Sequence, residues 1–413
     1  MIHLLKASAL LCISIYSITA AANPPDTIFY NGKILTVDPQ FSVAEAIAIS
    51  DGRIVAVGSN AEILELTESQ TNQYDLEGHT VIPGLIDNHM HYMRGASRWR
   101  FEARIDGVTS RKKALSVISQ RAKEIEPGQW VFVLGGWNEQ QFSDAPGGFT
   151  TEELDAAAPN NPVFIQKSYS KAYMNSLAEH ELARSKTDSS RESGQQNNSS
   201  TTQRRSNRSS SGRSQTGRSS SRRSGGARTI INQATTYVPS RSESERIEDI
   251  VLFNSVLNSH GLTTVYDVGR STDGNFDPVK TLAEQDELTV RVFHSLRYRA
   301  NNPIEVNEAL KFIKSSEPRS NNDWFGLIGI GEHTYNPLHD SSMRVSLYDD
   351  DVWQQFQRIA LYAAEGGWHI HEHAMQDSTA SRILDIAQVI NKDHLMNCLL
   401  YTSDAADEGL GVD

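Results

Sequence analysis

The chain has 413 residues, of which 38% are hydrophobic and 22% are charged. This composition is typical of a soluble globular protein with one large or two ordinary domains, and it excludes a bundle of membrane-spanning helices. The formal net charge of -12 is unevenly distributed, because residues 188–228 carry nine arginines against Asp188 and Glu192. That segment therefore has a charge of +7, and the remainder of the chain has -19.

Residues 1–22 have the pattern of a cleaved secretory signal. Lys6 precedes an apolar run over residues 7–16, and small residues at 20–22 come before an Asn-Pro-Pro sequence. This order is typical of a signal peptide, and a buried N-terminal helix is the alternative interpretation. No later apolar stretch is long enough to cross a bilayer. We therefore expect a periplasmic or secreted protein with no stable membrane insertion after the signal is cleaved.

From Asp26 to Thr80 the sequence predicts a small β unit. Short strand-like runs (TIFY, KILTV, AEAIAIS, RIVAVG and YDLEG) are separated by the turn signals Asn31-Gly32 and Asp51-Gly52. Such pairs favour tight turns, because both residues tolerate a left-handed backbone. We assign residues 23–82 to this unit.

After Pro83 the pattern changes to an alternation of helices and apolar strands. We expect helices near residues 110–125, 151–158, 245–259, 303–315, 351–365 and 377–390, and strands at WVFVLGG, PVFIQK, LTTVYDVG, LTVRVFHS, FGLIGIG and GWHIHEH. This alternation predicts an α/β fold in which helices cover a parallel sheet. The sheet is either open and doubly wound or closed as a (β/α)8 barrel.

Residues 188–228 interrupt the alternation. They contain 14 serines and no aliphatic or aromatic residue larger than Ala227, so they cannot bury enough apolar surface to offset the entropy of ordering. We expect a disordered insertion or a stretch read out of frame. An Arg/Ser-rich nucleic-acid-binding segment is the alternative, but the secretory signal argues against it, and we expect no nucleic-acid partner.

The end of the chain also has an unusual sequence. The stretch CLLYTSDAADE, which begins at Cys398, resembles the translation of an adapter used in sequencing libraries. We therefore expect residues 398–413 to be an adapter-derived tail, and the natural protein to be represented only to about Asn397.

Two histidines, His89 and His91, follow the strand-like VIPGLID directly. Residues two apart in a strand point the same way, so these imidazoles can bind one metal ion. The end of the first strand of a barrel lies at the face that carries active sites, which favours this interpretation. Two ordinary surface histidines are the alternative.

Several stretches together resemble the amidohydrolase superfamily, in the branch that includes N-substituted formamide deformylase. They are DGRIVAVG, TVIPGLIDNHMH, GWNEQQF, ELDAAAPNNPVFI, GLTTVYDVG and GWHIHEHAMQD, and the resemblance covers about residues 26–390 apart from the Arg/Ser-rich segment. It implies a metal-dependent hydrolase on a (β/α)8 barrel with a small N-terminal β-sandwich unit. Residues 83–397 would form the barrel, which we expect to be incomplete at the C-terminus.

The resemblance also implies metal ligands. His89 and His91 match the ligand pair of the first strand, and His373, in HEHAMQD, matches the histidine at the end of the fifth. Glu332, in GIGEH, lies where members carry a lysine or an acidic residue. It is a candidate bridging ligand, and a charged loop residue that binds no metal is the alternative. We expect zinc or another divalent metal, as one or two ions. The aspartate that acts as general base in the family would lie beyond residue 397, so the catalytic residues are unknown.

Two residues are candidates for substrate binding. Trp137, in GGWNEQQF, offers a large rigid surface that can wall a pocket, and membership of the apolar core is the alternative. Asn175 is retained from the pattern of the branch, whereas Ser170 stands where the branch usually has a histidine. This departure puts one expected substrate contact in doubt.

These observations predict an exported, metal-dependent amidohydrolase. It would hydrolyse a non-peptide C–N bond of a small amide or formamide-like substrate through a metal-activated water. We expect the chain as given to be inactive, because the general base and a further histidine ligand would lie beyond residue 397. A non-catalytic metal-binding or interaction protein is the alternative, and an Arg/Ser-rich nucleic-acid binder is a more distant one.

Overall fold

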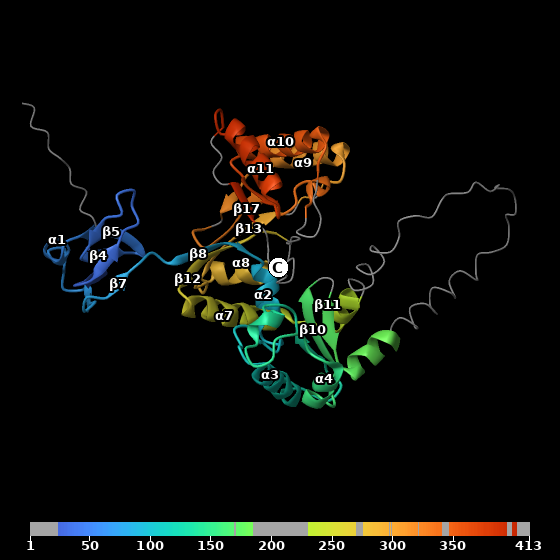
Figure 1. Ribbon diagram of the computed structural model, residues 1–413. Helices are drawn as coiled ribbons and strands as arrows, with labels where there is room; N and C mark the ends of the chain where they lie inside the picture. The colour runs from blue at the N-terminus through green and yellow to red at the C-terminus, as the bar shows by residue number, and fades with distance from the viewer. Residues whose placement is uncertain are drawn as a thin grey trace, which may run out of the picture. The chain divides into compact units, whose positions relative to one another are not determined.

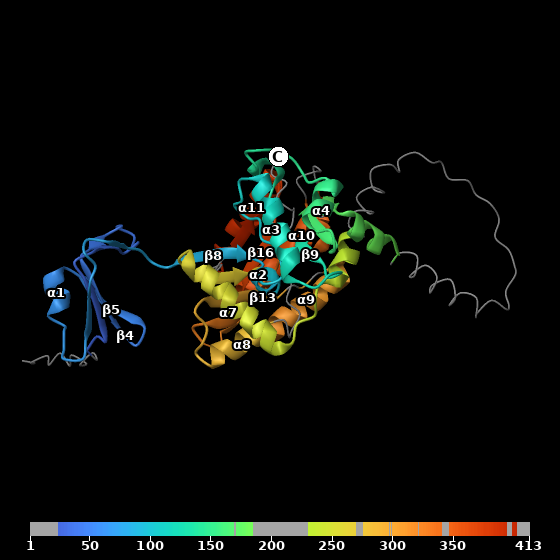
Figure 2. The same ribbon diagram turned by 90° about the horizontal axis from the view of Figure 1, so that it is seen from below.

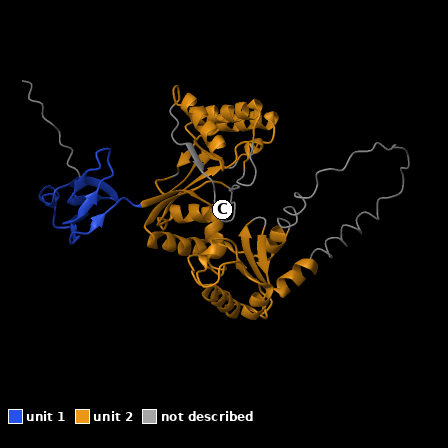
Figure 3. Ribbon diagram, viewed as in Figure 1, with its two compact units in different colours: residues 1–84 blue, residues 85–413 orange. Residues whose placement is uncertain are grey.

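The computed structural model describes residues 24–168, 171–184, 230–269, 276–296, 298, 300–320, 322–340 and 347–394, with the backbone of 399–402. The predicted signal, Ser170, the Arg/Ser-rich segment and residues 403–413 of the predicted tail lie outside the described residues. The chain divides into two compact units, Met1–Gly84 and Leu85–Asp413 (Figure 3). Within the described part of the chain, each helix is too short or too polar to cross a bilayer.

The first unit consists of two small sheets and one short helix. One sheet has the order β5-β4-β1-β6 and the other the order β3-β2-β7. Their bounds are β1 Thr27–Tyr30, β2 Lys33–Leu35, β3 Val43–Ala44, β4 Ala46–Ser50, β5 Arg53–Gly58, β6 Asn72–Asp75 and β7 Thr80–Val81, and helix α1 is Asn60–Leu64. The predicted turns form at Asn31 and Asp51, where φ is 55° and 49°. Ile28, Ala46 and Ile63 are buried in the small core of this unit.

A parallel sheet forms the centre of the second unit (Figure 1). Its six parallel strands are β8 Leu85–Met90, β12 Leu262–Asp267, β13 Arg291–Leu296, β15 Phe325–Ile330, β16 His369–His373 and β17 Leu399–Thr402. They lie side by side in the order in which they occur in the chain, and short β14 (Arg319–Ser320) pairs antiparallel with β15. A doubly wound sheet reverses its strand order at the middle, whereas a barrel wall does not. The topology therefore selects the barrel-type alternative.

Helices cover this sheet and follow its strands. They are α2 Tyr92–Trp99, α7 Glu243–Ser259, α8 Asp277–Glu284, α9 Pro303–Ser315, α10 Asp350–Glu365 and α11 Asp377–Ile390. Helices α7 and α8 lie side by side (Figures 1 and 2). Helix α7 begins where predicted because Ser242 and Glu245 form a capping box, which satisfies two backbone donors of the first turn. Two apolar clusters between helices and sheet form most of the core of this region.

The segment between α2 and α7 forms a separate small layer. It contains strands β9 Val131–Val133, β10 Val163–Ser168 and β11 Lys171–Met174, with helices α3 Arg111–Glu124 and α4 Thr151–Ala157. Strand β10 pairs parallel with β9 and antiparallel with β11. The strands predicted at WVFVLGG and PVFIQK are therefore confirmed, but they belong to this layer and not to the main sheet.

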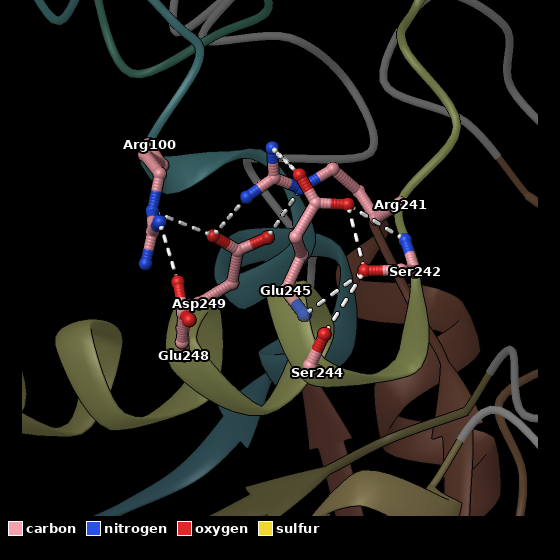
Figure 4. A network of polar contacts seen from close by, with 7 residues as sticks. All are labelled: Arg100, Arg241, Ser242, Ser244, Glu245, Glu248 and Asp249. Atoms are coloured by element: carbon pink, nitrogen blue, oxygen red, sulfur yellow. Dashed lines mark hydrogen bonds and ion pairs between the residues drawn. The ribbon is translucent and has the colours of Figure 1, made fainter.

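An ion-pair network ties α2 to α7. Asp249, which is 1% exposed, lies between two arginines (Figure 4). Its Oδ1 is 2.9 Å from Arg100 Nε and 2.9 Å from Arg241 Nη2, and its Oδ2 accepts a 3.0 Å hydrogen bond from Arg241 Nε. Glu248 adds a further contact to Arg100 at 2.9 Å. The network fixes the end of α2, and α2 follows the strand that carries His89.

Candidate metal centre

Glu332 follows β15 in a loop that the backbone holds firmly. The Glu332 N–H donates to the Val268 carbonyl at 2.6 Å, and Ser295 Oγ donates to the Gly331 carbonyl at 3.2 Å. Gly331 has a φ of 150°, and a Cβ at this position would lie 2.2 Å from the carbonyl oxygen of His371. Only glycine fits such an approach. These contacts hold the backbone of Gly331 and Glu332, at the start of the loop.

The residues of β16 alternate between the two faces of the sheet. Ile370 belongs to the core cluster that includes residues of α10 and α11. His369 and His371 instead face the ring of Tyr266 on β12, at centroid distances of 6.3 and 6.2 Å. His373 has the same parity as these two histidines. It therefore lies on the face of β16 opposite the helices, at the carboxyl end of the strand.

Three buried side chains gather at this end of the sheet. Potential ligand atoms of Glu332, His333 and His373 all lie within 4.8 Å of one another. His373 Nδ1 is 2.9 Å from Glu332 Oε1, and His333 Nε2 is 3.9 Å from Glu332 Oε2. Two further groups adjoin them, because His373 Nε2 is 3.6 Å from Asp340 Oδ1 and His333 Nδ1 is 3.1 Å from His339 Nδ1.

The chemistry of this cluster fits a divalent metal ion. Imidazole nitrogens and carboxylate oxygens are the ligands that zinc takes in catalytic sites. Burying a carboxylate among histidines is costly unless a cation or hydrogen bonds compensate. Burial alone would lower the pKa of His373, but the hydrogen bond and charge of Glu332, with the charges of Asp340 and Glu372, raise that pKa above its ordinary value. The site therefore has the negative potential that attracts a cation.

Asp340 fastens the neighbouring loop to the end of β16. The backbone N–H groups of Met375 and Gln376 donate to its carboxylate at 2.9 to 3.0 Å. These bonds hold the carboxylate next to His373 Nε2. The charge of Asp340 therefore acts on the imidazole of His373 from 3.6 Å, a distance too long for a hydrogen bond.

Glu372 lies beside His373 in the chain but on the other face of β16. It is fully buried, and its Oε2 accepts hydrogen bonds from the backbone N–H, at 3.0 Å, and the hydroxyl of Thr334. Burial raises the pKa of Glu372 to about 8, although the bonds from Thr334 favour the carboxylate. Strand β16 therefore contacts the loop of Glu332 from both faces of the strand, through His373 on one face and Glu372 on the other.

His89 and His91 lie at the carboxyl end of β8. Asp87 Oδ1 accepts a 3.0 Å hydrogen bond from the His89 N–H, and His91 is the N-cap residue of α2. The rings of His89 and His91 are 6.2 Å apart, and the ring of His89 lies 4.7 Å from that of His371. The charge of His91 also acts on the buried carboxyl of Asp267, whose pKa is raised mainly by burial.

The structure thus brings two of the four predicted ligands, Glu332 and His373, into direct contact. It also places His89 against His371, which lies on the face of β16 that carries His373. The full ligand set stays a prediction. Sequence reasoning did not single out His333, although its position next to Glu332 was a usable signal. Asp340 had no such signal, because only the tertiary structure brings it to His373.

Trp137 and Asn175 lie in the small layer and have partners within the protein. The indole of Trp137 is buried against Phe142 and Phe149, and its Nε1 donates to the Gln166 carbonyl at 3.0 Å. The Asn175 side chain makes four hydrogen bonds to the backbone, at Val163, Ala178, Ala158 and Asn161. These contacts explain both residues structurally, and their predicted roles in substrate binding stay predictions.

Comparison with known proteins identifies the family that the chain resembles. A sequence model of the amidohydrolase family matches residues 73–397. The N-substituted formamide deformylase of Arthrobacter pascens is 33% identical over 159 residues, which are 37% of this chain and 28% of that protein. Protein LONG AFTER FAR-RED 3 of Arabidopsis thaliana is 30% identical over 195 residues, which are 43% of this chain and 33% of that protein. The chain therefore spans about a third of the length of these relatives.

A solved structure shares the fold. An uncharacterized metal-dependent hydrolase from Pyrococcus horikoshii OT3 superposes with a TM-score of 0.50 at 17% identity, over 88% of this chain and 68% of that one. This likeness and the sequential strand order confirm the predicted (β/α)8 barrel-type fold.

Proposed function

This chain belongs to the amidohydrolase family, and we propose that it acts through a divalent metal ion, zinc or a similar one, on a non-peptide C–N bond. Glu332, His333 and His373 would hold the ion. The observation that carries the proposal is the buried contact of 2.9 Å between Glu332 and His373, with His333 beside them, at the carboxyl ends of parallel strands. Active sites of barrel enzymes lie at that end.

The predicted ligands His89 and His91 belong to the same proposal. His89 contacts His371, which lies on the same face of β16 as His373 and two residues before it. The carboxylate and four imidazoles of this proposal are enough ligands for one or two ions. We propose that His89 and His91 complete the coordination on the side of β8.

When bound, the ion would lower the pKa of a water molecule toward neutrality and polarise the carbonyl of the substrate. The protein would contribute orientation. Asp340 places a carboxylate 3.6 Å from His373 Nε2, and its bonds to the Met375 and Gln376 N–H groups fix that carboxylate.

A small amide or formamide is the substrate class that we propose. The support comes from the name of one relative, the N-substituted formamide deformylase of Arthrobacter pascens, and from the family itself. The exact substrate depends on loops at the mouth of the barrel, which vary among enzymes of one fold.

Metal analysis tests the proposal directly. The purified chain is loaded with zinc, dialysed and assayed for bound metal beside the variants Glu332→Gln and His373→Ala. We expect bound zinc in the wild type and its loss in both variants. His260→Ala, which removes an exposed histidine at the end of α7, should keep the wild-type content and serves as the control. Zinc content at background in the wild type would refute the metal site.

Activity is tested separately, with the purified protein. It is assayed on a panel of N-substituted formamides and acylated amines with added zinc, and released amine is measured. We expect turnover of at least one class, which a chelator abolishes. Turnover that is indifferent to the chelator would contradict the metal-dependent mechanism.

A further inference from the structure

Glu372 has a buried carboxyl group without a role in the reaction as proposed above. Its side chain is fully buried, and its Oε1 makes no hydrogen bond among the described residues. Its Oε2 accepts both the backbone N–H and the hydroxyl of Thr334, which is itself 1% exposed. Burying a carboxyl group in this way, with one oxygen unpaired, costs free energy that a leucine at the same place would not cost. The cost suggests a role other than general stability.

The partner of Glu372 lies in the loop that carries the candidate ligands. Thr334 follows Glu332 and His333 directly, and Glu372 precedes His373 directly. Loop and strand therefore make two adjacent contacts. On one face of β16 His373 meets Glu332 at 2.9 Å, and on the other face Glu372 holds Thr334 at 3.0 Å.

The loop needs such an anchor. His333 has a φ of 62°, a left-handed conformation that residues with a side chain adopt at a cost of about 1 kcal/mol or more. Conformations of this kind persist when surrounding contacts determine them, and the bonds to Thr334 act on the next residue. Without them, the backbone at His333 could relax and carry this imidazole away from Glu332 and His373.

We propose that Glu372 is a positioning residue, which fixes the loop of residues 331–335 so that Glu332 and His333 meet His373 in metal-binding geometry. The inference rests on the proposed metal site. It assigns to Glu372 no contact with the ion, because the side chain lies on the opposite face of the strand from His373. It also explains why the buried Thr334 directs both its N–H and its hydroxyl at one oxygen of Glu372.

Zinc affinity, measured by competition with a chromophoric chelator, tests this role. Glu372→Leu removes the acceptor and should raise the Kd for zinc by about 10- to 100-fold, the usual effect of losing a residue that orients metal ligands. Glu372→Gln keeps an oxygen that can accept both bonds, and its Kd should stay within about threefold of wild type. Asp249→Asn, which neutralises a buried carboxylate on α7, controls for loss of a buried charge and should not change the Kd.

A second readout does not depend on metal. In the apo chain, hydrogen exchange of the Thr334 amide should accelerate in Glu372→Leu and not in Asp249→Asn, because this amide loses its acceptor. Thr334→Val combined with Glu372→Leu should weaken zinc binding no more than Glu372→Leu alone, since the two residues act through one contact.

The outcomes separate the two proposals. A wild type that binds no zinc would overturn the proposed function. Zinc binding by the wild type with an unchanged Kd in Glu372→Leu would overturn the positioning role alone. A Kd in Glu372→Gln as poor as that of Glu372→Leu would also overturn it, since the charge and not the anchoring bonds would then be responsible.

Discussion

The ring of His89 lies 4.7 Å from the ring of His371, although three strands separate β8 from β16 in the sheet. Strands four positions apart in a flat sheet would be about 19 Å apart. The sheet must therefore curl until side chains from β8 and β16 meet across its interior. Tyr266 of β12 takes part in the same contact, with its ring 6.2 Å from that of His371. The curvature places the histidines of both strands on one concave face.

This contact leads to a prediction for His89. If His89 is a ligand, His89→Ala should weaken zinc binding by roughly 100-fold or more, as expected when one of a few ligands is lost from a site worth about 10 kcal/mol or more. His371→Asn, which alters the neighbour of His89, should have a smaller effect. Isothermal titration with zinc measures both. Equal metal affinity in His89→Ala and the wild type would remove His89 from the ligand set.

Gly331 should be irreplaceable for the loop that carries Glu332. In Gly331→Ala the new Cβ would lie 2.2 Å from the His371 carbonyl, and the φ of 150° disfavours alanine as well. We expect a loss of roughly 2–4 kcal/mol in the free energy of unfolding, with weaker zinc binding. Gly128→Ala is the matched control, because it also has a positive φ but open space around its Cβ. It should cost only about 1 kcal/mol.

Much of this architecture is encoded locally and was predictable. Ser242 and Asn302 are the N-caps of α7 and α9. Their side chains accept backbone N–H groups of the first turn, and the sequence shows such caps directly. Helix α2 was not predicted, because it is short and follows the strand of His89 without a cap. Tyr92 and Ala96, its buried residues, lie one turn apart, which is a weak signal over eight positions.

The candidate site was predictable only in part, for a physical reason. The strand spacing of His89 and His91 implies a shared direction, and His373 was identified through the resemblance of its motif to the family. Asp340 and Thr334 occur in loops, and their partners lie 35 and 38 residues away in the sequence. Such contacts depend on how β15 and β16 pair and on the course of the loop between them. Sequence periodicity carries no information about either.

The network around Asp249 should contribute measurably to stability. Asp249→Ala leaves Arg241 and Arg100 without their shared acceptor, and bonds to charged groups contribute about 1.5–3 kcal/mol. We expect a loss of about 2–3 kcal/mol in urea unfolding with zinc affinity unchanged. Glu248→Ala removes an exposed partner of Arg100 and should cost less than about 1 kcal/mol. Equal losses in the two variants would show that burial of Asp249 gives its ion pairs no advantage.

Glu139 should make part of the stability dependent on acid pH. It accepts hydrogen bonds from Lys171 at 2.8 Å, from Tyr173, and from Lys167 at 3.2 Å, and so joins the turn Glu139–Gln141 to β10 and β11. These bonds, that of Lys171 most of all, lower the pKa of Glu139 from 4.5 to about 2. A carboxyl whose pKa is lower in the folded state than in the unfolded one stabilises the fold above the unfolded value. That contribution is lost as the pH falls through the folded value.

Glu139→Gln should therefore be less stable than the wild type at pH 7, and the difference should shrink as the pH falls from about 4.5 toward 2. Urea unfolding at a series of pH values measures this difference. Glu179→Gln, a change at an exposed glutamate near β11, controls for the loss of a carboxylate in general. Because Lys171 is half-exposed, added salt should also reduce the difference at pH 7. A stability difference that stays constant from pH 7 to pH 2 would mean that the ionised carboxylate of Glu139 does not stabilise this layer.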